Sequence, residues 1–372
     1  MITRKIEESI RKDMFGGKAI VIIGARQVGK TTLLNTILGN EEKCLWLNGD
    51  DLETRTLLSD ITTEKYRSMT GGYDIIVIDE AQRIENIGLK AKLLTDNFKE
   101  KQLFLTGSSS FDLANKINEP LTGRKWEYKL YPLSFAELAE ANGLYNEIRK
   151  LPIRLVYGSY PDVTQNPGKE INILKQLTDS YLYKDIFEWQ RIKKPDMLVK
   201  LLQALAYQAG SEISLNELSR LIGIDKSTVE NYITLLEQTQ VIFRLSSLSR
   251  NLRNELKMSR KIYFYDNGIR NALINNFNDI STRNDIGILW ENWMISELQK
   301  RNHYGNIYCN TYFWRTTQQQ EIDYIEEADG KMTAYEFKWN PSKKAKISST
   351  FLKAYPNTEI KTVNKENFYE IL

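Results

Sequence analysis

The alternation of apolar and polar positions indicates a parallel α/β domain in the first 150 residues. Short apolar runs rich in β-branched residues occupy residues 19–25, 44–51, 74–81, 101–109 and 126–135. Helical patterns lie between them, for example at 32–38 and 89–98. Strand-like and helix-like segments in this order are typical of a parallel sheet with crossover helices. We therefore predict an α/β domain over residues 1–150.

Two further regions follow this domain. Residues 151–196 are rich in aromatic residues and mostly helical, and they are expected to form a connector. Residues 197–284 contain three helix-like stretches and then two strand-like runs, at 241–248 and 261–266. Two serines in this region are each followed three residues later by a glutamate, the spacing of a capping box: Ser214 and Ser227. This order predicts a winged helix-turn-helix domain.

Residues 285–372 have the pattern of a final α+β unit. A helix-like segment at 289–301 precedes three strand-like segments, at 312–316, 321–327 and 333–339. In the last of these strands, alternation places Glu336 and Lys338 on one face. The aromatic residues between and beside them are expected to pack against the helix from the opposite face: Tyr335, Phe337 and Trp339.

Composition narrows the classes of protein that fit. With 372 residues, 41% of them hydrophobic and 27% charged, the chain is long enough for several globular domains. A net charge of only +3 does not by itself indicate a nucleic-acid partner, so any basic surface must be local. Two distant cysteines without metal-ligand spacing suit a reducing compartment. No apolar run reaches ~18 residues, so we expect a cytoplasmic protein without a membrane partner.

The first strand leads directly into a glycine-rich segment and a helix. The segment reads Gly24-Ala25-Arg26-Gln27-Val28-Gly29-Lys30-Thr31-Thr32. In this strand–loop–helix context, the spacing predicts a Walker A loop that binds ATP. Its backbone N–H groups and the helix N-terminus would face the phosphates, Lys30 would reach the β- and γ-phosphates, and Thr31 would bind Mg²⁺.

The third apolar run ends in two acids, as expected downstream of a Walker A loop. Asp79 would hold the Mg²⁺ shell, and Glu80 would polarise the water that attacks the γ-phosphate. The next run delivers three hydroxyl residues to the same sheet edge: Thr106, Ser108 and Ser109. One of these, with Ser108 as our choice, would sense the γ-phosphate, although such residues are also ordinary in turns.

An arginine that stabilises the transition state is the remaining part of such a site. Arg83 follows the two acids, and Arg124 lies in Leu121-Thr122-Gly123-Arg124. We predict Arg124 for this role. A structural ion pair is the alternative for either arginine, because surface arginines commonly form such pairs.

Five motifs in this order give the chain a specific resemblance: GARQVGKTTLL, VIDEAQRI, LTGSSS, LTGR with YPLSFAE, and YGSYPDV. Over nearly its whole length the chain resembles AAA-type bacterial and archaeal ATPases that carry a long C-terminal domain of unknown function. The resemblance implies an ASCE-class P-loop core, with Lys30, Thr31, Asp79 and Glu80 in the roles already given. It does not imply a biological process. The chain is also similar to archaeal origin-binding and signal-transduction ATPases, in which a winged helix follows the nucleotide site.

The predicted winged helix suggests DNA as a partner, with its wing as the contact. The third helix carries Lys226, Asn231 and Gln238 but also the acids Glu230 and Glu237, so it is a poor recognition helix. Six basic residues downstream face a single acid, Glu255, and lie on the wing or its flank: Arg244, Arg250, Arg253, Lys257, Arg260 and Lys261. The alternative is a protein-interaction module whose basic run is a solvated face.

The C-terminal acids follow the order of the restriction-endonuclease-like fold, with its D…ExK core. Asp323 and Glu336 would bind a second divalent metal, Mg²⁺ or Mn²⁺, and Glu291 would orient a metal-bound water. Lys338 would complete the site. E-x-K is a weak motif alone, and a sheet whose exposed face happens to be charged is the alternative.

Two functions remain open at this point. The first is a Mg²⁺-dependent ATPase whose nucleotide state controls a winged-helix and nuclease-like region acting on DNA. The second is a signalling-type ATPase switch whose C-terminal region binds a protein partner. Both use the same ATP-site residues, so these residues do not separate the two functions.

Overall fold

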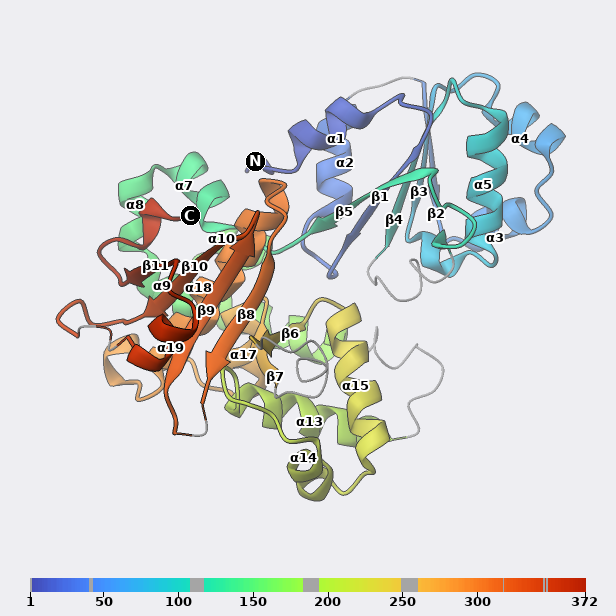
Figure 1. The fold of residues 1–372 in the computed structure, drawn as a ribbon. Coiled ribbons are helices and arrows are strands. Elements are labelled where there is room, and N and C mark those ends of the chain that lie inside the picture. Colours follow the sequence, from blue (N-terminus) through green and yellow to red (C-terminus); the bar gives the residue numbers. More distant parts are fainter. Residues whose placement is uncertain are drawn as a thin grey trace. The chain divides into compact units, whose positions relative to one another are not determined.

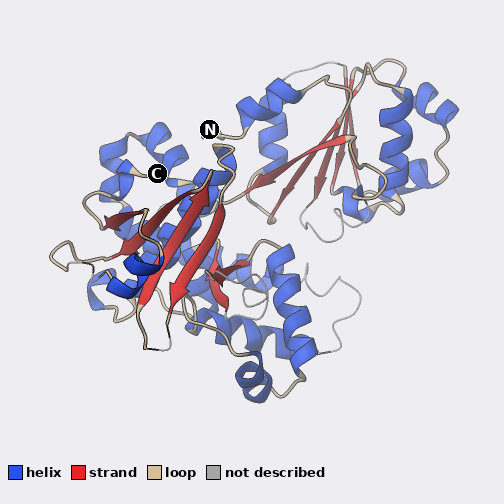
Figure 2. Ribbon diagram, viewed as in Figure 1, coloured by secondary structure: helices blue, strands red, loops and turns tan. Residues whose placement is uncertain are grey.

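The computed structural model describes residues 2–39, 43–107, 117–182, 194–248, 260–316, 318–343, 345 and 347–372. The chain forms two compact units. The first consists of Met1–Pro132 with Gln238–Gln240, and the second of Leu133–Glu237 with Val241–Leu372. Each unit contains one sheet with helices beside it (Figure 2).

The first unit is a five-stranded parallel sheet with the strand order β2-β3-β4-β1-β5. Its strands are β1 (Ala19–Gly24), β2 (Cys44–Asn48), β3 (Ile75–Asp79), β4 (Gln102–Gly107) and β5 (Lys125–Leu130). The predicted parallel α/β domain is therefore confirmed. Every residue of β1, β3 and β4 is buried, because helices cover both faces of a parallel sheet and its strands become continuous apolar runs.

Helices lie on both faces of this sheet (Figure 1). They are α1 (Glu7–Asp13), α2 (Lys30–Leu38), α3 (Leu52–Ser59), α4 (Thr63–Thr70), the 3₁₀ turn η1 (Ala81–Arg83) and α5 (Ile87–Asn97). The main core of the unit includes Val21, Ile23 and Ile78 from the strands and Leu94 from α5. These helices and strands place the carboxyl ends of β1, β3 and β4 at one edge of the sheet.

The second unit begins with the expected helical segment. Its elements are α7 (Phe135–Asn142), α8 (Leu144–Arg149), α9 (Leu151–Tyr157), α10 (Pro161–Gln165), α11 (Glu170–Gln176) and the π-helical turn η2 (Leu177–Leu182). Ser134 and Glu137 form a reciprocal capping box at the start of α7. The Phe135 N–H beside it donates to Glu297 Oε2 at 2.7 Å, which holds the YPLSFAE motif against the C-terminal region.

Three helices and a pair of antiparallel strands follow, in the order predicted for a winged helix-turn-helix domain. They are α13 (Pro195–Tyr207), α14 (Leu215–Ile222), α15 (Lys226–Gln238), β6 (Ile242–Ser247) and β7 (Arg260–Phe264). Ser214 caps α14 by accepting from the Glu217 N–H, as predicted. The predicted cap of α15 was wrong. Asp225 accepts from the Thr228 N–H at 2.8 Å and from the Ser227 hydroxyl, because its carboxylate lies one position before the helix.

The C-terminal region completes a mixed sheet with the order β11-β10-β9-β8-β6-β7. Its elements are α17 (Asn267–Leu273), η3 (Ile280–Thr282), α18 (Ile286–Tyr304), β8 (Asn310–Arg315), β9 (Glu321–Ala328), β10 (Lys331–Phe337), α19 (Ser349–Ala354), β11 (Thr358–Val363) and η4 (Phe368–Glu370). The hairpin β6–β7 belongs to this sheet through parallel pairing of β6 with β8, so one sheet crosses the predicted boundary at residue 285. No described helix is long and apolar enough to cross a lipid bilayer.

The expected division of faces on β10 is confirmed. Tyr335 and Phe337 belong to the core that also contains Trp290 and Trp293 of α18. Trp339 packs beside it, with its ring centroid 5.6 Å from that of Trp290. Glu336 of β10 and Lys338, directly after the strand, therefore point away from this aromatic core.

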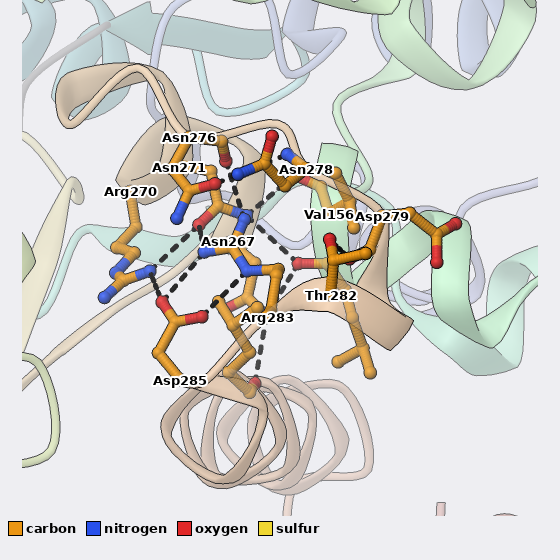
Figure 3. Close-up of polar contacts among 12 residues, drawn as sticks. Val156, Asn267, Arg270, Asn271, Asn276, Asn278, Asp279, Thr282, Arg283 and Asp285 are labelled. Carbon is orange, nitrogen blue, oxygen red and sulfur yellow. Dashed lines mark hydrogen bonds and ion pairs between the residues drawn. The ribbon is translucent and has the colours of Figure 1, made fainter.

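A buried polar network ties α17 to α9 and α18 (Figure 3). Arg270 and Arg283 both contact Asp285, at 2.6 and 2.8 Å. Asn271 donates to the Leu155 and Val156 carbonyls, and it accepts from both arginines. Because its members satisfy one another and backbone carbonyls, the network stabilises packing and is not an open binding site.

Candidate functional site

The glycine-rich loop has the backbone geometry that phosphate binding requires. A Cβ on Gly24 would lie 2.5 Å from the Leu130 carbonyl oxygen, so only glycine fits where the loop leaves β1. Gly29, directly before α2, has a φ of 95°, and Gln27 also has a positive φ. The buried Arg4 donates to the carbonyls of Val28 and Tyr131, at 2.7 and 2.6 Å. Arg4, which the sequence pattern did not single out, therefore fastens the loop to the end of β5.

Lys30 and Thr31 begin α2 as predicted. The Lys30 ammonium is buried and donates to the Gly24 and Ala25 carbonyls, at 2.9 and 3.1 Å. The Thr31 hydroxyl donates to Asp79 Oδ2 at 2.9 Å. The structure thus brings the predicted Walker A threonine to the acidic end of β3, while Lys30 lies against the loop itself.

Asp79 is held from two sides. Its Oδ2 accepts from Thr31, and its Oδ1 accepts from the hydroxyl of Thr106 on β4. The Glu80 N–H donates to both Asp79 Oδ1 and Thr106 Oγ1, at 3.1 and 3.2 Å. Because Thr106 is fully buried, it orients Asp79 rather than lying open to a phosphate. Adjacent strands with Ile78 opposite Leu105 explain the contact, which the sequence pattern alone did not reveal.

Glu80 lies just beyond β3 in an unusual backbone conformation. Its φ and ψ are 48° and 42°, in the left-handed region that residues other than glycine rarely adopt. Its carboxylate accepts from the amide of Gln82 at 2.5 Å. Such conformations in non-glycine residues concentrate at functional sites.

The other predicted nucleotide-site residues fall into two groups. Within the loop, Ala25 and Val28 are fully buried, Arg26 is half-buried, and Gln27, with Thr31 and Thr32 on α2, is exposed. Ser108 and Ser109 lie outside the described residues, so their proposed contact with the γ-phosphate stays a prediction.

The two arginine candidates occupy different ends of the sheet. Arg83 lies in η1, near the acids, and pairs with Asp50 at 3.4 Å. Arg124 precedes β5, and its carbonyl accepts from the N–H of Ala19, the first residue of β1. It contacts Asp96 and lies at the edge opposite the P-loop, because β1 and β5 run in parallel. The structure does not bring Arg124 to the P-loop of its own chain.

The predicted C-terminal acid and lysine residues also meet. Lys338 Nζ lies 2.8 Å from Glu336 Oε2 and 3.5 Å from Asp323 Oδ2. Asp323 also accepts from the Phe337 N–H at 2.7 Å. Between Tyr312 and Trp314 the pairing partner on β9 moves from Ile325 to Ile322, so β9 contains one extra residue in the stretch formed by Asp323 and Tyr324. A bulge of this kind re-aims a side chain, and here Asp323 joins Glu336 of β10 and Lys338, which directly follows that strand.

Glu291 has different neighbours from those predicted. The Tyr263 hydroxyl donates to Glu291 Oε1 at 2.7 Å, and Lys261 Nζ lies 3.2 Å from the same oxygen. Lys261 also contacts Glu321. Burial raises the pKa of Glu291 to about 7, against the opposing effect of Lys261, and repulsion from Asp323 adds to the rise.

The remaining acids of this cluster are also perturbed. Burial raises the pKa of Glu336 to about 7, and repulsion from Asp323 acts in the same direction. Burial likewise raises the pKa of Asp323, opposed by Lys338. Glu336 Oε1 is buried and has no hydrogen-bond partner among the described residues. Within that part of the chain, however, no three His, Cys, Asp or Glu side chains gather as a metal site, so Glu291 does not join Asp323 and Glu336 as predicted.

The described basic residues of the predicted wing form ion pairs within the second unit or are buried in it. Arg244 pairs with Glu230 at 2.5 Å and also with Glu237, both on α15. Arg260 lies 3.4 Å from Glu230. Lys261 is only 2% exposed. The acids that made α15 a poor recognition helix thus bind the wing arginines, which the sequence pattern did not anticipate. Arg250, Arg253 and Lys257 lie outside the described residues.

Comparison with known families agrees with the geometry of the first unit. Residues 16–139 match the family model of an AAA domain. After this AAA domain, residues 148–280 match a domain of unknown function, DUF8612, and residues 286–371 match another, DUF4143. The predicted AAA-type core with a C-terminal part of unknown function is therefore confirmed at this level.

Similar proteins occur in bacteria and archaea. The uncharacterized protein Rv2008c of Mycobacterium tuberculosis is 24% identical over 339 residues, covering 88% of this chain and 72% of its own. The uncharacterized protein MJ1544 of Methanocaldococcus jannaschii is 24% identical over 386 residues, covering 96% and 83%. Among solved structures, the Walker-type ATPase PABY2304 of Pyrococcus abyssi has a TM-score of 0.53 at 15% identity, covering 74% of this chain and 96% of its own. This last similarity is one of fold.

Proposed function

We propose that the chain is a Mg²⁺-dependent ATPase whose AAA domain binds and hydrolyses ATP. The observation that supports this most directly is the hydrogen-bonded series Thr31–Asp79–Thr106, which lies beside the buried ammonium of Lys30 and the carboxylate of Glu80. A hydroxyl and a carboxylate oxygen 2.9 Å apart are the donor set that Mg²⁺ takes beside nucleotide phosphates. The residues present therefore fit Mg²⁺ and ATP.

Each residue then has a distinct task. Lys30 exchanges its bonds to the Gly24 and Ala25 carbonyls for the β- and γ-phosphates, and the loop N–H groups bind phosphate oxygens. Thr31 and Asp79 would hold Mg²⁺, which would neutralise charge at the phosphates. Glu80 accepts the proton of the attacking water. Arg124 would act only on the nucleotide of a neighbouring copy, since it lies at the opposite edge in its own chain.

Two substitutions test this function. Lys30→Ala should weaken ATP binding about 10- to 100-fold, because it removes charge-assisted hydrogen bonds worth ~1.5–3 kcal/mol each. Glu80→Gln should keep ATP affinity and lose hydrolysis. Binding is measured by isothermal titration with Mg²⁺–ATP, and turnover by phosphate release. Equal turnover in the wild type and both variants would refute the assignment.

A second candidate function, phosphodiester cleavage, is favoured by the carboxylate cluster of the second unit. Asp323, Glu336 and Lys338 meet in space, and the order α18, β8, β9, β10, α19, β11 suits a restriction-endonuclease-like core. Glu336 Oε1, which is buried and has no hydrogen-bond partner in the described part of the chain, is an available ligand atom. We propose that Asp323 and Glu336 bind one Mn²⁺ or Mg²⁺ ion and that Lys338 stabilises charge developing on the phosphate.

Metal titration of the full chain tests the second candidate. Mn²⁺ should raise the melting temperature, by an amount that corresponds to ~2.7 kcal/mol at a hundredfold excess over Kd. Asp323→Ala should abolish this shift, whereas Asp79→Ala should leave it intact. Lys338→Ala should keep the shift and lose any nicking of supercoiled DNA. A wild-type chain that shows no Mn²⁺ response at millimolar metal would exclude this site.

The remaining question is whether the predicted winged helix-turn-helix binds a protein or DNA. Internal pairing of Arg244 and Arg260, with burial of Lys261, favours a protein partner over DNA for the described surface. Turnover that does not respond to added DNA would support the protein partner. DNA-stimulated turnover would instead support the DNA-acting ATPase, with Arg250, Arg253 and Lys257 as the phosphate contacts.

A further inference from the structure

The side chain of Glu80 is restrained by a residue on the next turn. Gln82 Nε2 donates to Glu80 Oε2 at 2.5 Å, and Gln82 is only 7% exposed. We propose that Gln82 is a positioning residue for ATP hydrolysis, whose amide aims the Glu80 carboxylate at the attacking water. The inference rests on the proposed ATPase function and adds a residue to it. Gln82 itself need not touch the nucleotide.

The backbone around Glu80 is held by packing, so rotation of the side chain is the main motion that this residue retains. A Cβ on Gly49 would lie 2.3 Å from the Glu80 carbonyl oxygen, so the turn after β2 packs directly against this peptide. The Gly49 N–H donates to the Asp79 carbonyl at 2.8 Å. Asp50 of the same turn pairs with Arg83. With the left-handed backbone of Glu80 held between these contacts, Gln82 restrains the side chain.

The chemistry of an amide suits this role. A general base must be ionised and must present one oxygen to water. The Gln82 N–H forms its hydrogen bond with Oε2, so Oε1 can accept from the water. Because the amide is neutral, it does not transfer its proton to the carboxylate, which stays ionised. During hydrolysis the water oxygen bonds to the γ-phosphorus, its proton passes to Glu80, and the bond to the bridging oxygen breaks to release ADP.

Three variants of the full chain test the inference: Gln82→Ala, Gln82→Glu and, as a matched control, Glu85→Gln. Gln82→Ala should lower kcat about 10- to 100-fold while Kd for Mg²⁺–ATP changes less than about twofold, because it removes a hydrogen bond to a charged group. Gln82→Glu is nearly isosteric and places two carboxylates together. Since neighbouring carboxylates resist ionising together, its rate should rise with pH over a range where the wild-type rate is flat. The control, on the exposed surface of the same segment, should match the wild type.

The outcomes separate the inference from the function on which it rests. A wild type without ATP turnover, or a Glu80→Gln variant with full turnover, would refute the ATPase itself. If wild type is active and Glu80→Gln is not, unchanged kcat and pH profiles in both Gln82 variants would overturn the positioning role. A parallel loss of ATP binding and melting temperature in Gln82→Glu would also overturn it, since that pattern indicates a structural role alone.

Discussion

Asp285 is the common partner of two buried arginines. Arg270 is 3% exposed and Arg283 is 7% exposed, and both contact its carboxylate (Figure 3). Burial raises the pKa of Asp285, but hydrogen bonds from Arg283 and Arg270 outweigh burial and hold the pKa at about 2. The carboxylate therefore stays ionised in the folded chain over the whole physiological range.

Asp285→Asn should destabilise the protein strongly, because it leaves two buried guanidinium groups without their counter-ion. The expected loss is about 3–5 kcal/mol in the free energy of unfolding, measured by urea denaturation at pH 7. A folded-state pKa below the ordinary value means that this contribution exists at neutral pH and disappears as the pH falls from about 4 to about 2. The exposed turn residue Asp279 is the control, and Asp279→Asn should cost far less stability than Asp285→Asn. Equal losses in both variants would contradict the prediction.

The hairpin β6–β7 and the helix α15 depend on each other through Arg244. This half-buried guanidinium binds Glu230 and Glu237, which lie seven residues apart and so on one face of α15. Removal of the arginine would take its cation away from both acids, and of the two arginine contacts with Glu230 only that from Arg260, at 3.4 Å, would remain. The pairing explains how an acidic third helix and a basic strand coexist in one sequence.

Arg244→Met should lower the free energy of unfolding by about 1–3 kcal/mol while it keeps the apolar stem of the side chain. The loss should shrink in the triple variant that also carries Glu230→Gln and Glu237→Gln, since the unpaired acids are then neutral. Arg220→Met, on the exposed surface of α14, should change stability by less than ~0.5 kcal/mol. Denaturant titration of the variants measures these differences, and a silent Arg244→Met would show that the pairs contribute nothing.

For the molecule as a whole, the carboxylate cluster should set a distinctive dependence of stability on pH. Glu336 has a folded-state pKa of about 7, above its ordinary value of 4.5. The folded chain therefore binds more protons than the unfolded chain between these values, so the contribution of Glu336 is fully present below about pH 4.5 and is lost as the pH rises toward 7. Burial is the main cause of the raised pKa, and repulsion from Asp323 adds to it.

Glu336→Gln should remove this part of the pH dependence. Relative to the wild type, the variant should be more stable at pH 8 than at pH 5, because a neutral amide has no buried charge to develop. Melting temperatures across that range, recorded in chelator so that no divalent metal binds, provide the comparison. Glu359→Gln, on the exposed face of β11, should shift the melting temperature equally at both pH values. A constant difference for Glu336→Gln would contradict the assignment.

Local motifs predicted the parts of this protein whose partners are close in sequence or set by strand periodicity. The loop from Gly24 to Thr31 is one continuous segment. A single sequence motif therefore predicts its residues together with the strand before it and the helix after it. Asp79 ends a strand of the same parallel sheet and therefore reaches the same edge. Alternation along residues 333–339 likewise placed Glu336 with Lys338 and left the aromatic residues for the core.

Tertiary structure decided the contacts between residues far apart in the chain. Thr106 meets Asp79 because β3 and β4 are neighbours in register, and Lys261 meets Glu291 across 30 residues. The basic run predicts Arg244 as part of a DNA contact, whereas the fold pairs it with Glu230 of α15. Periodicity indicates which side of an element a residue occupies, whereas pairing of strands and packing of helices determine what lies opposite it. That is why the residue types at both acidic sites were predictable from the sequence, while most of their partners were not.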